Sequence, residues 1–137
     1  MTRGMATSLG ADTLNRITST INAAAIQIHR ALGPGLFENA YLACLCYERR
    51  SAALRIQVEK PIPLVYRGVR IDCAYRADLV VADSVLVEVK ALETLAGIHS
   101  QQLYTYLRLG YPVGLLLNFG APTMKAGIRR VVNNFPE

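Results

Sequence analysis

Hydrophobic residues near the start of the chain recur every three or four positions from Thr13 to Ala31, which predicts an amphipathic helix over this range. Either Asp12 or Thr13 can act as its N-terminal cap. The run Gly33-Pro34-Gly35 predicts its end, because glycine accepts positive φ and proline cannot continue the helical hydrogen-bond ladder. The apolar stripe of this helix consists of Leu14, Ile17, Ile21, Ala24, Ala25, Ile28 and Leu32.

The same spacing predicts two further helices. One runs from about Leu36 to Ser51, and Phe37, Tyr41 and Leu45 share one of its faces. The other runs from about Leu92 to Leu109, and Gly110 ends it. The positions at helical spacing in this last helix are Leu95, Ile98, Gln102, Tyr106 and Leu109.

Between these helices the pattern changes to the two-residue alternation of β-strands. Ile56 and Val58 alternate with polar neighbours, and Pro61 and Pro63 mark an edge or a bend between strands. The Arg67-Gly68 pair predicts a hairpin turn that follows Leu64 to Tyr66. The strands expected after this turn are Val69 to Val81 and, beyond the turn Ala82-Asp83-Ser84, Val85 to Val89.

The remaining pattern completes an α/β fold. Pro112 to Leu117 is continuously apolar, as expected for a strand that is buried on both faces, and Lys125 to Val132 fits either a strand or a helical turn. The order along the chain is therefore two helices, several strands, a helix and a strand. This order predicts a mixed central sheet flanked by helices. We expect a flexible tail over residues 1–12 and a single domain over 13–137.

The composition narrows the class of protein. The chain of 137 residues is 52% hydrophobic, which is enough for a folded core. Its apolar runs are shorter than the roughly 20 residues of a membrane span, and its start lacks a secretory signal, so we expect a cytoplasmic protein without a membrane partner. The three cysteines lack zinc or disulfide spacing. The net charge of +5 fits either solubility or attraction to nucleic acid.

Charged residues inside the apolar strands indicate chemistry. Glu88 and Lys90 are two apart and share a strand face, and a tight hairpin brings Asp78 beside Glu88. Two adjacent carboxylates repel each other unless a divalent cation lies between them, and their oxygens suit Mg²⁺. With Lys90 to orient a metal-bound water, such a group could hydrolyse phosphodiester bonds. The alternative is an ordinary ion pair between Glu88 and Lys90.

Five more residues join this set of candidates. Glu38 lies in the first turn of the second helix, where its charge also suits the helix dipole. Gln102 and Tyr106 are four apart and present an amide and a phenol on one helix face, either as part of a site or at the rim of the core. His99 and His29 can serve as metal ligands or bases, or can be packed histidines.

Gly35, Glu38 and Tyr41, within the segment from Leu32 to Tyr41, resemble the signature of the GxxExxY proteins, which are placed in the PD-(D/E)XK nuclease superfamily. The resemblance runs from about residue 14 to residue 132. The other segments that carry it are Gln57, Val65 to Gly68, Asp78 to Val81, Val87 to Lys90, His99 to Gln102, Tyr106-Leu107 and Gly114 to Gly120.

This resemblance implies a restriction-endonuclease-like core. Asp78, Glu88 and Lys90 match the D…(D/E)xK motif of the superfamily, and Glu38 matches the acidic residue on the preceding helix. Gln102 and Tyr106 match the QxxxY element of the branch similar to the RecB nuclease domain, where these side chains lie near the metal and the nucleic-acid backbone. The implied cofactor is Mg²⁺ or Mn²⁺, bound by Glu38, Asp78 and Glu88.

Together these observations predict a metal-dependent nuclease that acts on DNA. Because the chain has no room for a separate specificity domain, we expect a homodimer or a partner protein to supply target choice. The alternative is a non-catalytic module that keeps the fold and binds nucleic acid or a partner, and a weaker one is a hydrolase using Cys44 or Cys46 with His29. The expected phosphate contacts are Arg67, Arg70, Arg76, Lys125, Arg129 and Arg130.

Overall fold

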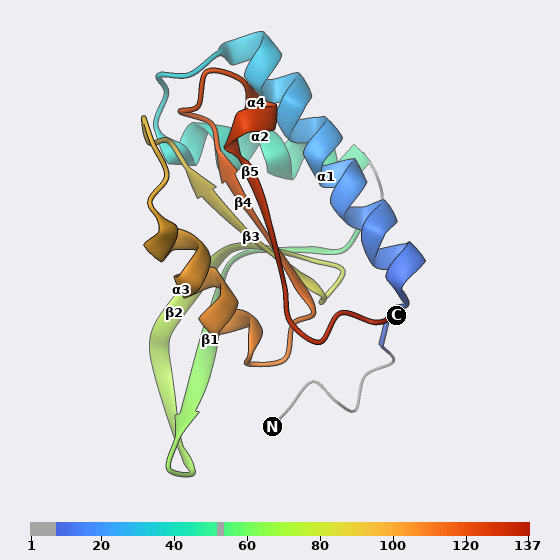
Figure 1. Ribbon diagram of the computed structural model, residues 1–137, viewed down its shortest axis with the longest axis vertical. Coiled ribbons are helices and arrows are strands. Elements are labelled where there is room, and N and C mark those ends of the chain that lie inside the picture. The colour runs from blue at the N-terminus through green and yellow to red at the C-terminus, as the bar shows by residue number, and fades with distance from the viewer. Residues whose placement is uncertain (1–7, 52–53) are drawn as a thin grey trace.

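A computed structural model describes residues 8–51 and 54–137, with the side chains of 50, 51, 73 and 74 left out. Residues 1–7 of the expected flexible tail therefore lie outside the described residues. A five-stranded sheet runs through the molecule with helices packed against it (Figure 1). The elements are α1 (Ala11–Leu32), α2 (Glu38–Ser51), β1 (Ile56–Tyr66), β2 (Val69–Val81), β3 (Val85–Lys90), α3 (Gly97–Leu107), β4 (Val113–Asn118), α4 (Met124–Gly127) and β5 (Ile128–Val132).

The strands follow the chain order across the sheet, β1-β2-β3-β4-β5. The pairs β1–β2, β2–β3 and β4–β5 are antiparallel, and β3–β4 is parallel because α3 makes the crossover between them. The α/β class with a mixed sheet flanked by helices is thereby confirmed. Along the segment 125–132 both alternatives occur, since α4 ends where β5 begins. Among the described residues no helix is long and apolar enough to cross a membrane.

Alternation along the central strands divides the core between the two faces of the sheet. Val85, Val87 and Val89 of β3 pack in one cluster with the stripe of α1, whereas Leu86 packs in a second cluster with Leu103 of α3. Leu32, at the end of the predicted stripe, lies outside this cluster and is 45% exposed, so its assignment to the stripe is wrong. All six residues of β4 are buried, as its continuous apolar run predicts. The sheet is therefore covered on both faces at β3 and β4, and helices can hold side chains over either end of these strands.

The helix ends and faces differ in part from the prediction. Helix α1 begins at Ala11 with Gly10 as its N-cap, so the expected caps Asp12 and Thr13 are wrong because both lie inside the helix. Helix α2 begins at Glu38, and Phe37, which the pattern placed on the core face, is 86% exposed. Tyr41 and Leu45 of that face are fully buried, as expected.

Helix α3 is shorter than predicted and rotated. It begins at Gly97 rather than near Leu92, and its buried residues are Leu103 and Leu107. Ile98, expected on the core face, is exposed. Leu103 and Leu107 face the core, and each lies one position after Gln102 or Tyr106, which is about 100° around the helix axis. The expected face of α3 therefore lies at the border of the core.

The proline pair lies within one long edge strand. Strand β1 continues through Pro61 and Pro63, with a register shift between Ile62 and Leu64, so the alternative of a bend between two strands is wrong. An edge strand tolerates proline because its missing N–H can lie on the unpaired side. Arg67 and Gly68, with φ of 51° and 75°, form the two-residue turn that leads into β2. The hairpin of β1 and β2 extends well beyond the other strands (Figure 1).

Candidate active site

The candidate site lies where β2 and β3 separate. Regular pairing of these strands extends from Val81↔Val85 to Leu79↔Val87. Beyond that pair, Asp78 Oδ2 accepts a hydrogen bond of 2.8 Å from the Val89 N–H, and Glu88 Oε1 accepts one of 3.4 Å from the Asp78 N–H. The carboxylates thus accept hydrogen bonds from backbone N–H groups at the point where the regular ladder ends. The structure brings Asp78 and Glu88 together, as the hairpin argument expected.

An interruption of the strand alternation accompanies this separation. Ala77 and Val80 of β2 pack in the cluster of α3, whereas Leu79 packs in the cluster of α1. Strict alternation would put Ala77 and Leu79 on one face, so the strand shifts by one position at Asp78. The opposite strand is irregular at the same level, because Glu59, between the pairs Val58↔Leu79 and Lys60↔Ala77, has a φ of 50°. The local kink directs Asp78 toward β3.

Burial and neighbouring charges perturb the pKa of both acids. Burial, and next the charge of Asp78, raises the pKa of Glu88 to about 7, while Lys90 opposes the rise. Burial also raises the pKa of Asp78, and the negative charges of Glu38 and Glu59 act in the same direction. The Val89 N–H and Lys90 oppose these effects. In the absence of a cation, Glu88 therefore holds a proton part of the time at neutral pH.

A pocket of about 200 Å³ lies between the end of β3 and α3. Glu88 and Lys90 line it from the strand, and Gln102 and Tyr106 line it from the helix. Four of the six sequence candidates for catalysis therefore share one pocket. His99 also lines it, and its Nδ1 accepts a hydrogen bond of 3.2 Å from the Ala96 N–H. This bond favours the interpretation of His99 as a packed residue at the start of α3.

Tyr75, which the sequence analysis missed, also belongs to this pocket. Its hydroxyl donates a hydrogen bond to Glu88 Oε1, and its ring stacks on Tyr106 with centroids 3.6 Å apart and planes 7° apart. Burial raises the pKa of Tyr75 well above its usual range, and the charge of Glu88 adds to this effect, so Tyr75 remains a donor. Asp78 was identified as a polar residue within an apolar strand, and the same criterion applied to Tyr75 would have identified it as well.

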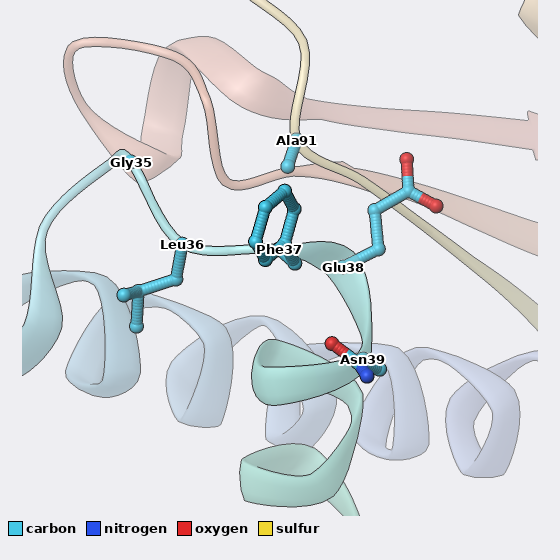
Figure 2. Close-up of a pocket in the computed structure, with 6 residues that line it drawn as sticks. All are labelled: Gly35, Leu36, Phe37, Glu38, Asn39 and Ala91. Atoms are coloured by element: carbon cyan, nitrogen blue, oxygen red, sulfur yellow. The ribbon is translucent and has the colours of Figure 1, made fainter.

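Glu38 approaches the acids from the opposite side. It is the first residue of α2, and the arrowhead of β3 points toward this end of the helix (Figure 1). A second hollow of about 600 Å³ lies here, lined by residues 35–39 and Ala91. Figure 2 shows the Glu38 carboxylate extending toward the segment that leads to Ala91. Its charge acts on Asp78, so the structure places all three acids in one region.

Tyr41 fixes the loop that carries Glu38. The Tyr41 hydroxyl donates a hydrogen bond of 2.5 Å to Gly33 O and accepts one of 3.2 Å from the Leu36 N–H. Its ring stacks on Phe119 with centroids 4.4 Å apart. Gly33 and Gly35 adopt φ of 70° and 116°, which only glycine accepts at little cost. The loop that precedes Glu38 is thus tied to the core by one buried side chain.

Asn118 fixes the segment that follows Lys90. It is 2% exposed. Its side chain accepts a hydrogen bond of 2.8 Å from the Leu92 N–H and donates one of 2.9 Å to Leu92 O. Gly120 packs against the same backbone, because a Cβ on it would lie 2.2 Å from Leu92 O. His29 is also buried, and its Nε2 donates a hydrogen bond of 2.9 Å to Ala121 O. This contact favours the interpretation of His29 as a packed structural residue. The chain on both sides of the acids is therefore held by buried contacts.

The expected phosphate contacts do not form one face. Arg67 lies at the turn between β1 and β2, whereas Arg129 and Arg130 lie on β5, the opposite edge of the sheet. Arg76 pairs with Glu59 at 3.2 Å, and Arg130 donates 2.9 Å to Asn15 Oδ1. The others are Arg70, which pairs with Asp72 at 2.8 Å, and Lys125, which lies on α4. The two cysteines with described side chains, Cys44 and Cys46, are half-buried and pack against the core.

The acids fit a hard divalent cation. Each of Asp78 and Glu88 uses one identified oxygen in the hydrogen bonds above, which leaves the second oxygen for a ligand. Mg²⁺ in proteins is usually held by one or two carboxylates, with water and substrate phosphate completing the shell. Among the described residues, no group of three His, Cys, Asp or Glu side chains is close enough to hold a metal by itself. The arrangement matches a Mg²⁺ site of two carboxylates rather than a closed protein cage.

Comparison with known proteins agrees with this geometry. A family model described as the PD-(D/E)XK nuclease superfamily matches residues 15–131. Searches of curated proteins and of solved structures gave no match. The matched range contains the five-stranded sheet up to Val131 and every acid of the candidate site. The chain therefore belongs to the PD-(D/E)XK nuclease superfamily, and its mixed sheet between helices is a restriction-endonuclease-like core.

Proposed function

We propose that this protein is a metal-dependent nuclease that hydrolyses phosphodiester bonds in DNA. The observation that carries the proposal is the meeting of Asp78 and Glu88 beside Lys90, at the point where β2 and β3 separate. Partial burial raises the pKa of both acids, and the charge of Asp78 raises that of Glu88 further, so their placement destabilises the fold and a structural role does not account for it. Nucleases of this superfamily generally use divalent metal ions.

Asp78 and Glu88 would hold Mg²⁺ or Mn²⁺, with Glu38 assisting from the start of α2. When bound, such an ion polarises a phosphoryl oxygen and lowers the pKa of its water to supply a nucleophile. Tyr75 and the Asp78 N–H fix Glu88 Oε1, and the Val89 N–H fixes Asp78 Oδ2, so the chain prepares both ligands in advance. Ligands held in this way lose little freedom when the ion binds.

Lys90 would act on the substrate from the same strand face as Glu88. Its charge lowers the pKa of both Asp78 and Glu88, which shows that it lies in their electrostatic environment. An ammonium group at this position orients the attacking water and neutralises the negative charge that develops on the phosphate. A residue without charge at position 90 removes both effects.

Gln102 and Tyr106 would position the nucleic-acid backbone. Both line the pocket that contains Glu88 and Lys90. The stacking of Tyr106 on Tyr75 holds its ring in place, so its hydroxyl has a defined position for a phosphate oxygen. These two residues, together with Gly35, Glu38 and Tyr41, support assignment to the GxxExxY proteins and to the branch similar to the RecB nuclease domain.

Cleavage of labelled single- and double-stranded DNA and RNA tests the proposal. We expect DNA cleavage with Mg²⁺ or Mn²⁺, none with EDTA, and a loss of about 100-fold or more in Glu88→Gln and Lys90→Met. Asp83→Asn is the matched control, because Asp83 lies on the same hairpin but in an exposed ion pair with Arg55. Cleavage that persists in EDTA, or in both site variants, would contradict the proposal.

A non-catalytic module remains the competing interpretation, and binding separates the two. Binding without cleavage in every metal condition would favour it. We further propose that 13–137 acts as one nuclease-like domain and that a second copy or a partner supplies target choice, which sedimentation at working concentration tests.

A further inference from the structure

Phe37 presents an unusually exposed aromatic ring beside the candidate site. It is 86% exposed, more than any other large apolar side chain that the structure describes. The next most exposed aromatic residue, Tyr47, lies on α2, which begins just after Phe37, and is 70% exposed. Phe37 carries no polar group that water could stabilise, so its exposure leaves a large apolar surface without cover. Single exposed apolar residues are common, and its surroundings give this one a specific meaning.

The backbone that carries Phe37 is held rigidly. Gly33 and Gly35 bring the chain to the start of α2, and the Tyr41 hydroxyl bonds to Gly33 O and to the Leu36 N–H. Tyr41 itself is fully buried and stacked on Phe119. The ring is therefore presented from a fixed position rather than from a flexible loop. A preorganised contact of this kind loses little entropy when a ligand binds.

The ring also lines a wide, open hollow. Residues 35–39 and Ala91 line a space of about 600 Å³, within the range of small-molecule sites. Figure 2 shows the Phe37 ring between Leu36 and Glu38, below Ala91. Glu38 is the charged residue of this lining, and its charge acts on Asp78. A molecule against the ring therefore lies next to Glu38, one of the three acids.

We infer that Phe37 is a stacking subsite for an unpaired nucleobase of the substrate strand. This inference rests on the proposed nuclease function and specifies its substrate as single-stranded or frayed nucleic acid. The lining offers an apolar ring face and a carboxylate, which suit a neutral flat base and repel a phosphate. A base pair inside a duplex is already stacked on both faces, so an unpaired base covers the ring more readily.

Binding of fluorescein-labelled oligothymidylate in EDTA tests the inference, because no cleavage is then expected. We expect Phe37→Ala and Phe37→Leu to weaken the affinity for the single strand by about 10-fold, the effect typical of a lost base–aromatic stack. The affinity for the same sequence in a blunt duplex should not change. Tyr47→Ala is the matched control, since it removes a second exposed aromatic ring, which lies on α2 itself, and should leave both affinities unchanged.

Phe37→Trp supplies a direct readout of stacking. The chain contains no tryptophan, so this variant has a single indole whose fluorescence should fall when the single strand binds. Unchanged single-strand binding by Phe37→Ala, or an equal loss on duplex, would overturn the inference. A change in the sedimentation of Phe37→Ala without a change in binding would instead identify the ring as a contact between copies, and would also overturn it.

The two proposals fail in different ways. Phe37-dependent binding of single strands without cleavage under any metal condition would refute the nuclease and leave the stacking subsite in place. Metal-dependent cleavage that requires Lys90 but is insensitive to Phe37 on single strands would do the reverse. Absence of both binding and cleavage would refute both.

Discussion

Glu88→Gln is expected to stabilise the metal-free protein at neutral and alkaline pH. The pKa of Glu88 lies at about 7 in the folded protein, against 4.5 for an ordinary glutamate, because the side chain is largely buried and faces Asp78. A carboxyl group whose pKa is raised by folding stabilises the fold in its protonated form. That stabilisation is complete below about pH 4.5 and is lost as the pH rises through about 7.

The size of the effect follows from the two pKa values. Each pKa unit corresponds to about 1.36 kcal/mol, so a difference of about 2.5 units gives about 3 kcal/mol in the free energy of unfolding. Glutamine has nearly the same shape, carries no charge, and keeps an Oε1 that can accept from Tyr75 and from the Asp78 N–H. Between pH 4 and pH 8 the variant should therefore gain about 3 kcal/mol relative to the wild type.

Urea unfolding in EDTA, followed by circular dichroism from pH 4 to pH 8, measures this difference. Other carboxylates titrate in both proteins, so the difference between the two curves isolates Glu88. Asp83→Asn, which removes an exposed carboxylate from the turn of the same hairpin, should follow the wild type. If Glu88→Gln also loses stability in parallel with the wild type, Glu88 is not a destabilised carboxylate and the argument for a poised metal ligand fails.

Three further substitutions examine the supports of the site. Tyr75→Phe removes the donor to Glu88 and should weaken Mn²⁺ binding about 10-fold in calorimetric titrations at unchanged secondary structure, whereas equal affinity would contradict its role in fixing the carboxylate. Asn118→Leu removes the partners of the Leu92 N–H and C=O and should lower the free energy of unfolding by about 2 to 5 kcal/mol in urea titrations. A loss below about 1 kcal/mol would argue against the role of Asn118 in holding this segment. Gly120→Ala puts a Cβ 2.2 Å from Leu92 O, so the thermal midpoint of this variant should fall by about 10 °C or more, or the protein should not fold. Gly97→Ala, which has open space at its Cβ, should keep a midpoint close to that of the wild type.

Local pattern was sufficient for the elements and for the acids. The spacing of Leu14, Ile17 and Ile21 located α1, and the continuous run before Asn118 located a strand buried on both faces. Asp78 and Glu88 stood out because charges inside apolar strands require a partner, and hairpin geometry alone placed them across from each other. These signals depend on neighbours in sequence or on one tight turn.

Features that depend on packing between distant segments were not accessible in this way. The rotation of α3 is set by how closely Leu103 approaches Gly114 of β4, where a Cβ would lie 2.9 Å from the leucine Cγ. The exposure of Phe37 depends on the loop that Tyr41 ties to the core. The role of Tyr75 depends on the shift of strand alternation at Asp78, which no regular period contains.

The length of the β1–β2 hairpin has a practical consequence. From Asp78 back to Val69 the strand extends for about 30 Å at 3.3 Å per residue, so the Arg67-Gly68 turn lies far from the acids. Figure 1 shows this tip extending away from the rest of the molecule. A dye, an affinity tag or a short recognition peptide inserted at the turn would lengthen the arm and leave the core contacts unchanged. The hairpin thus offers an attachment point from which the chain can be immobilised or directed to a chosen target.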